Sequence, residues 1–191
     1  MTLERHPFQK KHVVIVPALC IASLLSGCNT QSTKPTPEAT PEQTCATLKN
    51  VLSHADNDFA EIKTRQIISP MVDIWESKNI FPDSDRCQIW HWGKGRVNYT
   101  CLWDEKSAAA AKAKYDQYRP VVARCLGSSW RANEVKTAAG FQTLFLKEGD
   151  PVGVSMRYFE DHRSLGKGWW TSLIIGSELK VNDPLKRYSD N

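Results

Sequence analysis

The chain has 191 residues, of which 41% are hydrophobic and 24% charged, and its formal net charge is +4. This length fits one domain plus targeting or linker segments, since a domain typically takes about 100 to 200 residues. The apolar content and the seven tryptophans exclude a disordered or collagen-like chain. Proteins that bind nucleic acid usually show a strong basic excess, so a net charge this small predicts no nucleic-acid partner.

Residues 1–27 have the pattern of a secretory signal peptide. A basic, polar stretch at 5–12 precedes thirteen mostly apolar residues at 13–25. A helix of that length rises only about 20 Å, which is short of the roughly 30 Å hydrocarbon core of a bilayer. We therefore expect the segment to be removed, which leaves 22 basic and 20 acidic residues in the rest of the chain.

The end of this segment, Leu25-Ser26-Gly27-Cys28, resembles the lipobox of bacterial lipoproteins. The resemblance implies that Cys28 is acylated on its thiol and becomes the first mature residue, usually with an acylated amino group as well. Two or three chains anchor far more firmly than one, because each buried CH₂ adds about 0.8 kcal/mol. The next residue is Asn29 and not aspartate. For a Gram-negative source, this implies the outer membrane with the domain facing the periplasm. An ordinary signal peptide with a chance cysteine is the alternative.

Residues 28–43 are predicted to form a tether. They combine three prolines with threonine, serine, glutamine and glutamate and contain no large apolar residue. In a polyproline-like conformation of about 3.1 Å per residue, residues 29–40 span roughly 35 to 40 Å. A domain on such a tether can reach partners away from its membrane.

Four cysteines remain once Cys20 leaves with the signal peptide and Cys28 carries the lipid. An even number in an exported domain predicts two disulfides, with three possible connectivities. A zinc site is the alternative, but no Cys-x-x-Cys spacing supports it. The four residues are Cys45, Cys87, Cys101 and Cys125.

Residues 44–180 are predicted to form one globular domain that contains two main helices. The first helix begins at the capping box Thr40-Pro41-Glu42-Gln43 and follows an apolar seam to about residue 65. The second covers about residues 104–126, with Pro120 expected to kink or split it.

Two aromatic-rich runs, 87–92 and 97–103, flank a Gly-Lys-Gly-Arg turn and predict a β-hairpin. A hairpin between two helices brings the start of the first helix near the end of the second. This arrangement favours the pairs Cys87–Cys101 and Cys45–Cys125.

The last third of the domain is predicted to be a four-stranded meander. The fold class is therefore α+β, in two layers, with two main helices on one face of an antiparallel sheet and the order α-β-β-α-β-β-β-β. Residues 66–85 are left without an assignment, residues 181–191 are expected to be a polar tail, and no internal repeat is visible. The four predicted strands are 130–136, 141–147, 152–160 and 169–177.

Motifs for catalysis are absent from the mature sequence. Its three histidines, His54, His91 and His162, have no metal-binding spacing, and no Gly-x-Ser-x-Gly elbow presents a nucleophile. The two Gly-Lys-Gly turns do not continue as phosphate-binding loops. We expect no metal and no cofactor.

Aromatic residues give the one candidate binding site. Tryptophans flank both Gly-Lys-Gly turns, and tryptophan and arginine are enriched in binding hot spots. The competing interpretation is that these rings fill the core. The candidate residues are Trp90, Trp92, Lys94, Arg96, Lys167 and Trp169.

These features together predict a lipid-anchored envelope protein with a non-catalytic binding domain. Its partner would be another envelope protein or a cell-wall glycan, and an inhibitor or immunity protein is one form of this function. The alternative is a cell-envelope hydrolase that uses carboxylate catalysis.

Overall fold

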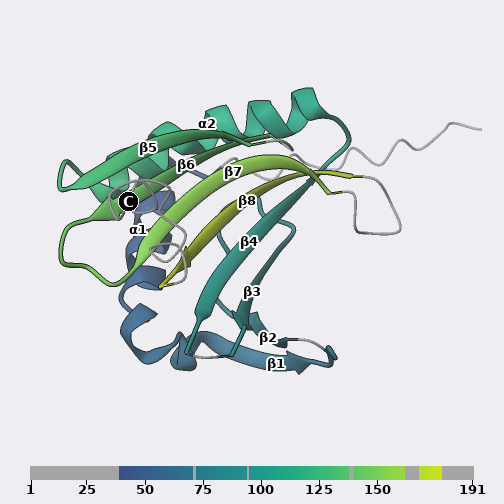
Figure 1. Cartoon of the computed structure of the whole chain (residues 1–191), viewed down its shortest axis with the longest axis vertical. Coiled ribbons are helices and arrows are strands. Elements are labelled where there is room, and N and C mark those ends of the chain that lie inside the picture. Colours follow the sequence, from purple (N-terminus) through teal and green to yellow (C-terminus); the bar gives the residue numbers. More distant parts are fainter. Residues whose placement is uncertain (1–38, 71, 94, 138–139, 162–167, 178–191) are drawn as a thin grey trace, which may run out of the picture. The chain divides into compact units, whose positions relative to one another are not determined.

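The computed structural model describes residues 39–177 except 71, 94, 138–139 and 162–167 (Figure 1). All of them belong to one compact unit, Pro37–Asn191. The predicted signal peptide, Cys28 and the polar tail lie outside the described residues, as do two candidate site residues, Lys94 and Lys167.

The domain has two similar halves, and in each half one α-helix is followed by four strands. The first half holds α1 (Pro41–Leu52), two 3₁₀ turns η1 (Ala55–Asn57) and η2 (Ala60–Ile62), β1 (Lys63–Ile67), β2 (Asp73–Ser77), β3 (Arg86–His91) and β4 (Val97–Glu105). The second half holds α2 (Ala108–Leu126), β5 (Trp130–Thr137), β6 (Gly140–Lys147), β7 (Gly153–Asp161) and β8 (Gly168–Gly176).

All eight strands form a single antiparallel sheet in the order β1-β2-β3-β4-β8-β7-β6-β5. Each half is a meander, and the two meanders join where β4 pairs with β8. The sheet curls from β5 at the top of Figure 1 to β1 at the bottom. The α+β class, the two helices and the antiparallel sheet agree with the sequence analysis. The predicted strand order is incomplete, because it lacks β1 and β2 in the stretch left unassigned.

The first helix is shorter than predicted, ending at Leu52 and not near residue 65. The backbone of Asp58 and Phe59 has positive φ angles of 56° and 58°, which no helix can contain. Phe59 and Ile62 are nonetheless buried in the core, each 1% exposed. The apolar seam therefore continues through two 3₁₀ turns, which bury the same side chains without a helix.

The second helix, α2, runs uninterrupted through Pro120. It begins at Ser107, whose hydroxyl accepts a hydrogen bond from the amide of Ala110 at 3.2 Å. Pro120 lies on the exposed side of the helix, and of the predicted kink or split, the split does not occur. No helix in the described ranges has the length and apolar character needed to cross a membrane.

The core lies between α2 and the sheet face formed mainly by β4, β7 and β8. On β4, Tyr99, Cys101 and Trp103 alternate toward this side. Their register partners on β8 and β7 continue the same face. Those partners are Leu173, Ile175, Val154 and Met156, all almost fully buried.

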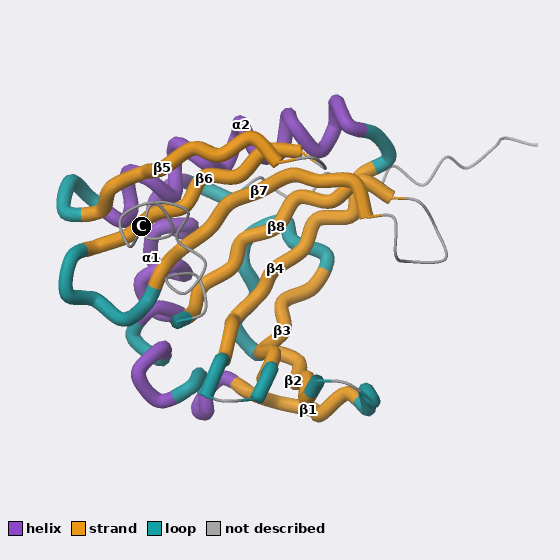
Figure 2. Tube along the Cα trace, in the orientation of Figure 1, coloured by secondary structure: helices purple, strands orange, loops and turns teal. Residues whose placement is uncertain are grey.

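Both predicted disulfides are present. Cys87 and Cys101 are direct register partners in the β3–β4 hairpin. Cys45 near the start of α1 bridges to Cys125 near the end of α2. Figure 2 shows α1 running steeply away from that end of α2. The second bridge therefore fixes the point at which the two helices meet.

Candidate functional site

The predicted hairpin turn joins β3 and β4 and presents two tryptophans. Gly93 and Gly95 have φ angles of 76° and 67°, a conformation that glycine adopts without strain. Trp92 is 42% exposed, and its ring centroid lies 5.2 Å from that of the half-buried Trp90. Arg96 closes the turn and is half-buried.

Trp169 is not part of this cluster. It pairs with Glu105 at one end of β4, whereas the hairpin turn lies beyond Val97 at the other end. At about 3.3 Å per residue, the length of β4 separates the two by more than 20 Å. The structure thus divides the predicted strip of candidate residues into two places.

Trp169 and its neighbour Trp170 lie on opposite faces of the sheet, as alternation in a strand requires. Trp169 is on the face that α2 covers. Trp170 pairs with Asp104 on β4 and Phe159 on β7, on the other face, which no described helix covers. We call it the helix-free face.

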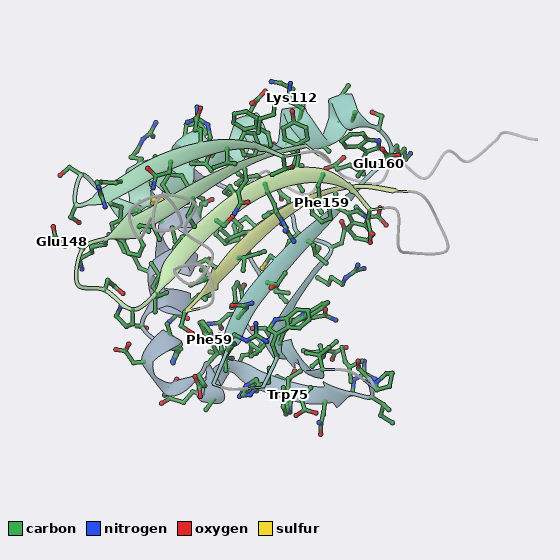
Figure 3. All side chains as sticks on the ribbon, viewed as in Figure 1. Phe59, Trp75, Lys112, Glu148, Phe159 and Glu160 are labelled. Carbon is green, nitrogen blue, oxygen red and sulfur yellow. A yellow bond between two sulfur atoms is a disulfide. The ribbon has the colours of Figure 1, made fainter. Side chains whose placement is uncertain are left out.

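Two arginines stack on two aromatic rings at this end of the helix-free face. The Arg86 guanidinium lies 4.7 Å from the ring centroid of Trp170, and that of Arg157 lies 4.4 Å from the ring centroid of Phe159. Trp170 and Phe159 are direct register partners on neighbouring strands. We refer to these four residues as the arginine–aromatic patch; Figure 3 labels Phe159 within it.

Strand register builds the arginine–aromatic patch from segments far apart in sequence. Arg86, Leu102, Ser172 and Arg157 form one row across β3, β4, β8 and β7. Arg157 Nε donates a hydrogen bond of 3.0 Å to the hydroxyl of Ser172, which is fully buried. Arg157 thus stacks on Phe159 of its own strand, whereas Arg86 reaches Trp170 across β4.

The chemistry of the patch suits recognition of carboxylates. A guanidinium that stacks on a ring does so through its flat face, and its planar N–H groups match the geometry of carboxylate oxygens. Arginine and tryptophan are also the residues most enriched in binding hot spots. The candidate residues from the sequence include none of these four, although Trp170 flanks a Gly-Lys-Gly turn and must face away from Trp169 in a strand.

On the opposite face, Trp169 lines a groove of about 460 Å³ beside the start of α2. Figure 3 labels Lys112 on α2 and Glu160 near the end of β7, which contribute to it. The remaining lining residues come from α2 and from β5 to β7: Ala108, Ala109, Lys136, Thr137, Gly140 and Tyr158.

A third cluster joins Lys63, Trp75 and His91 at the β1–β3 end of the sheet. Lys63 Nζ lies 2.7 Å from His91 Nε2 and 4.9 Å from the centroid of the Trp75 ring. Burial lowers the pKa of His91, and the positive charge of Lys63 lowers it further. Burial also lowers the pKa of Lys63, against the attraction of Asp58. The ammonium can donate to Nε2 only while His91 is neutral.

Within the described ranges, histidine, cysteine and acidic side chains form no group of three or more that would suit a metal ion. Comparison with known proteins matches the chain to no family, no curated protein and no solved structure.

Proposed function

We propose that this protein is a lipid-anchored component of the bacterial envelope whose domain binds another envelope protein without catalysis. The lipobox resemblance at Cys28 supports the anchor, and the proline-rich tether supports reach from the outer membrane into the periplasm. An inhibitor or immunity protein would be one form of this activity.

The observation that carries the proposal is the arginine–aromatic patch on the helix-free face. Its four side chains come from three strands, and Arg86 is exposed while Arg157, Phe159 and Trp170 are half-buried. Protein interfaces are centred on such aromatic and arginine anchors, surrounded by a polar rim. The carboxylate-hydrolase alternative gains no specific support from the described residues.

The experiment is quantitative capture from cross-linked envelopes with the full lipidated protein as bait. The test variant combines Arg86→Ala with Arg157→Ala, and a second variant replaces both by lysine, which keeps the charge but loses the flat stacking group. Arg124→Ala, an exposed arginine on α2, is the matched control.

We expect the double alanine variant to reduce capture of the partner at least about tenfold, because hot-spot residues contribute roughly 2 kcal/mol or more. The lysine variant should show a smaller loss of capture, and Arg124→Ala should capture the partner as wild type does. The melting temperature should stay within a few degrees of wild type. Undiminished capture by the folded double variant would contradict the assignment of the patch as the binding surface.

A further inference from the structure

The groove beside the start of α2 has the size of a small-ligand site and is separate from the arginine–aromatic patch. Its volume of about 460 Å³ lies within the range of roughly 300 to 1,000 Å³ that such sites occupy. It lies on the face that α2 covers, whereas the patch lies on the helix-free face.

Two aromatic rings in the groove form a supported platform. The ring centroids of Tyr158 and Trp169 are 6.4 Å apart, and their planes are inclined by only 32°. Tyr115, which is buried, packs edge-on against Tyr158 at 5.4 Å and shares a hydrogen bond with Thr143. The platform is therefore held from below by the core, while the small side chains Ala108 and Ala109 leave its side open.

Charged and polar groups line the edges of this platform. Lys112 lies 2.5 Å from Asp116, which raises the lysine pKa and keeps it charged. Lys136 is exposed and has no ion pair with any described residue. Glu160 and the hydroxyl of Thr137 add acceptors. The groove thus combines an aromatic surface with Lys136, with Lys112 in its ion pair with Asp116, with the carboxylate of Glu160 and with the hydroxyl of Thr137.

From this combination we propose that the groove binds a pyranoside that carries a carboxylate, as in an acidic envelope glycan. The apolar face of the sugar ring packs on Tyr158 and Trp169, and its carboxylate lies toward Lys136 and Lys112. Sugar hydroxyls need both donors and acceptors, which the lysines and Glu160 provide. A phosphate-rich ligand fits less well, because Glu160 opposes a high negative charge.

The groove and the Cys45–Cys125 bridge lie at opposite ends of α2. The tether leads into α1 at Thr40, and the Cys45–Cys125 bridge ties the start of α1 to the last turn of α2. The groove lies at the first turn of the same helix, whose 19 residues span about 28 Å. The sugar site therefore lies at the end of α2 remote from the start of α1.

The test is isothermal titration calorimetry on the full chain with two sugars that differ by a single acidic group. N-acetylmuramic acid carries a lactyl carboxylate that N-acetylglucosamine lacks. The groove variants are Trp169→Ala and Lys136→Gln. Their matched controls are Trp92→Ala, an exposed tryptophan at the other end of β4, and Lys78→Gln, an exposed lysine outside the groove.

We expect the acidic sugar to bind at least about fivefold more tightly than the neutral one, an advantage of about 1 kcal/mol. Lys136→Gln should abolish that preference, Trp169→Ala should weaken both sugars, and both controls should bind as wild type does. Equal binding of the two sugars, no binding of either, or an equal loss in Trp92→Ala would overturn the proposal. Binding of the Cys28→Ser chain to phosphatidylglycerol vesicles would also overturn the proposal if Lys136→Gln abolished it. None of these outcomes bears on the arginine–aromatic patch, whose variants are different.

Discussion

At the scale of single residues, the contact between Lys63 and His91 makes stability depend on pH. Protonation of His91 would place two positive charges 2.7 Å apart in a partly buried site. Burial and Lys63 both lower the histidine pKa, while Asp58 and Asp73 oppose the shift. The folded chain therefore takes up this proton at a lower pH than the unfolded chain does.

The sign of the effect follows from linkage. Below about pH 6.5, the ordinary histidine pKa, the unfolded chain binds the proton first, so the free energy of unfolding falls as the pH decreases. We expect His91→Gln to flatten the dependence between pH 7.5 and 5.5 in urea unfolding. Trp92→Ala, which changes the residue next to His91 but removes no titrating group, serves as the control and should keep the wild-type slope. Identical slopes for wild type and His91→Gln would contradict the linkage.

Residue patterns predicted part of the candidate site. Tryptophans beside the turns were recognisable, and the opposite orientation of Trp169 and Trp170 follows from strand geometry alone. The partners Arg86 and Arg157 were not predictable, because no local pattern shows that β3 and β7 lie on either side of β4 and β8 in one sheet. Only the order of the strands brings their side chains to the same two rings.

At the scale of secondary-structure elements, the strength of the local pattern decided what the sequence predicted. The β3–β4 hairpin and the last four strands carry clear alternation and turn residues, and the structure confirms them within two residues at each end. The strands β1 and β2 were missed because their residues are mostly exposed or half-buried. Ile68 shows the problem, since this apolar residue next to β1 is fully exposed.

The Cys45–Cys125 bridge is expected to stabilise the junction of the two helices. For a sequence separation of 80, loop-closure entropy corresponds to about 4.5 kcal/mol, against about 3 kcal/mol for the separation of 14 between Cys87 and Cys101. Cys45→Ala with Cys125→Ala should therefore lower the free energy of unfolding by about 2 to 5 kcal/mol in guanidinium titrations.

The slope of those titrations distinguishes the mechanism. Removal of the long cross-link lets the unfolded chain expand, so the m-value should rise. Cys87→Ala with Cys101→Ala is the comparison and should raise the m-value less, because its loop is short. Equal m-values in the two double variants would show that the long bridge does not restrict the unfolded chain as expected.

At the scale of the whole molecule, the proposed anchor is Cys28. We expect Cys28→Ser to leave the precursor uncleaved at this site, or to release a soluble product after cleavage elsewhere. Metabolic labelling with a palmitate analogue provides the measurement. Cys20→Ser is the matched control, since that cysteine lies within the predicted signal peptide, and it should keep the label. Label retained in Cys28→Ser would exclude this residue as the acylation site.

The pairing of β4 with β8 also determines the order in which the molecule can be completed. The first half can form its hairpin and the Cys87–Cys101 bridge from neighbouring segments, but the other side of β4 is paired only by β8, where Asn98 lies opposite Gly176. Contacts between such distant segments form slowly, because a long stretch of chain must be ordered first. Until β8 pairs with it, β4 remains an open edge that can pair with another chain. The last strand therefore closes the sheet and ends the period in which the newly synthesised protein can aggregate through that edge.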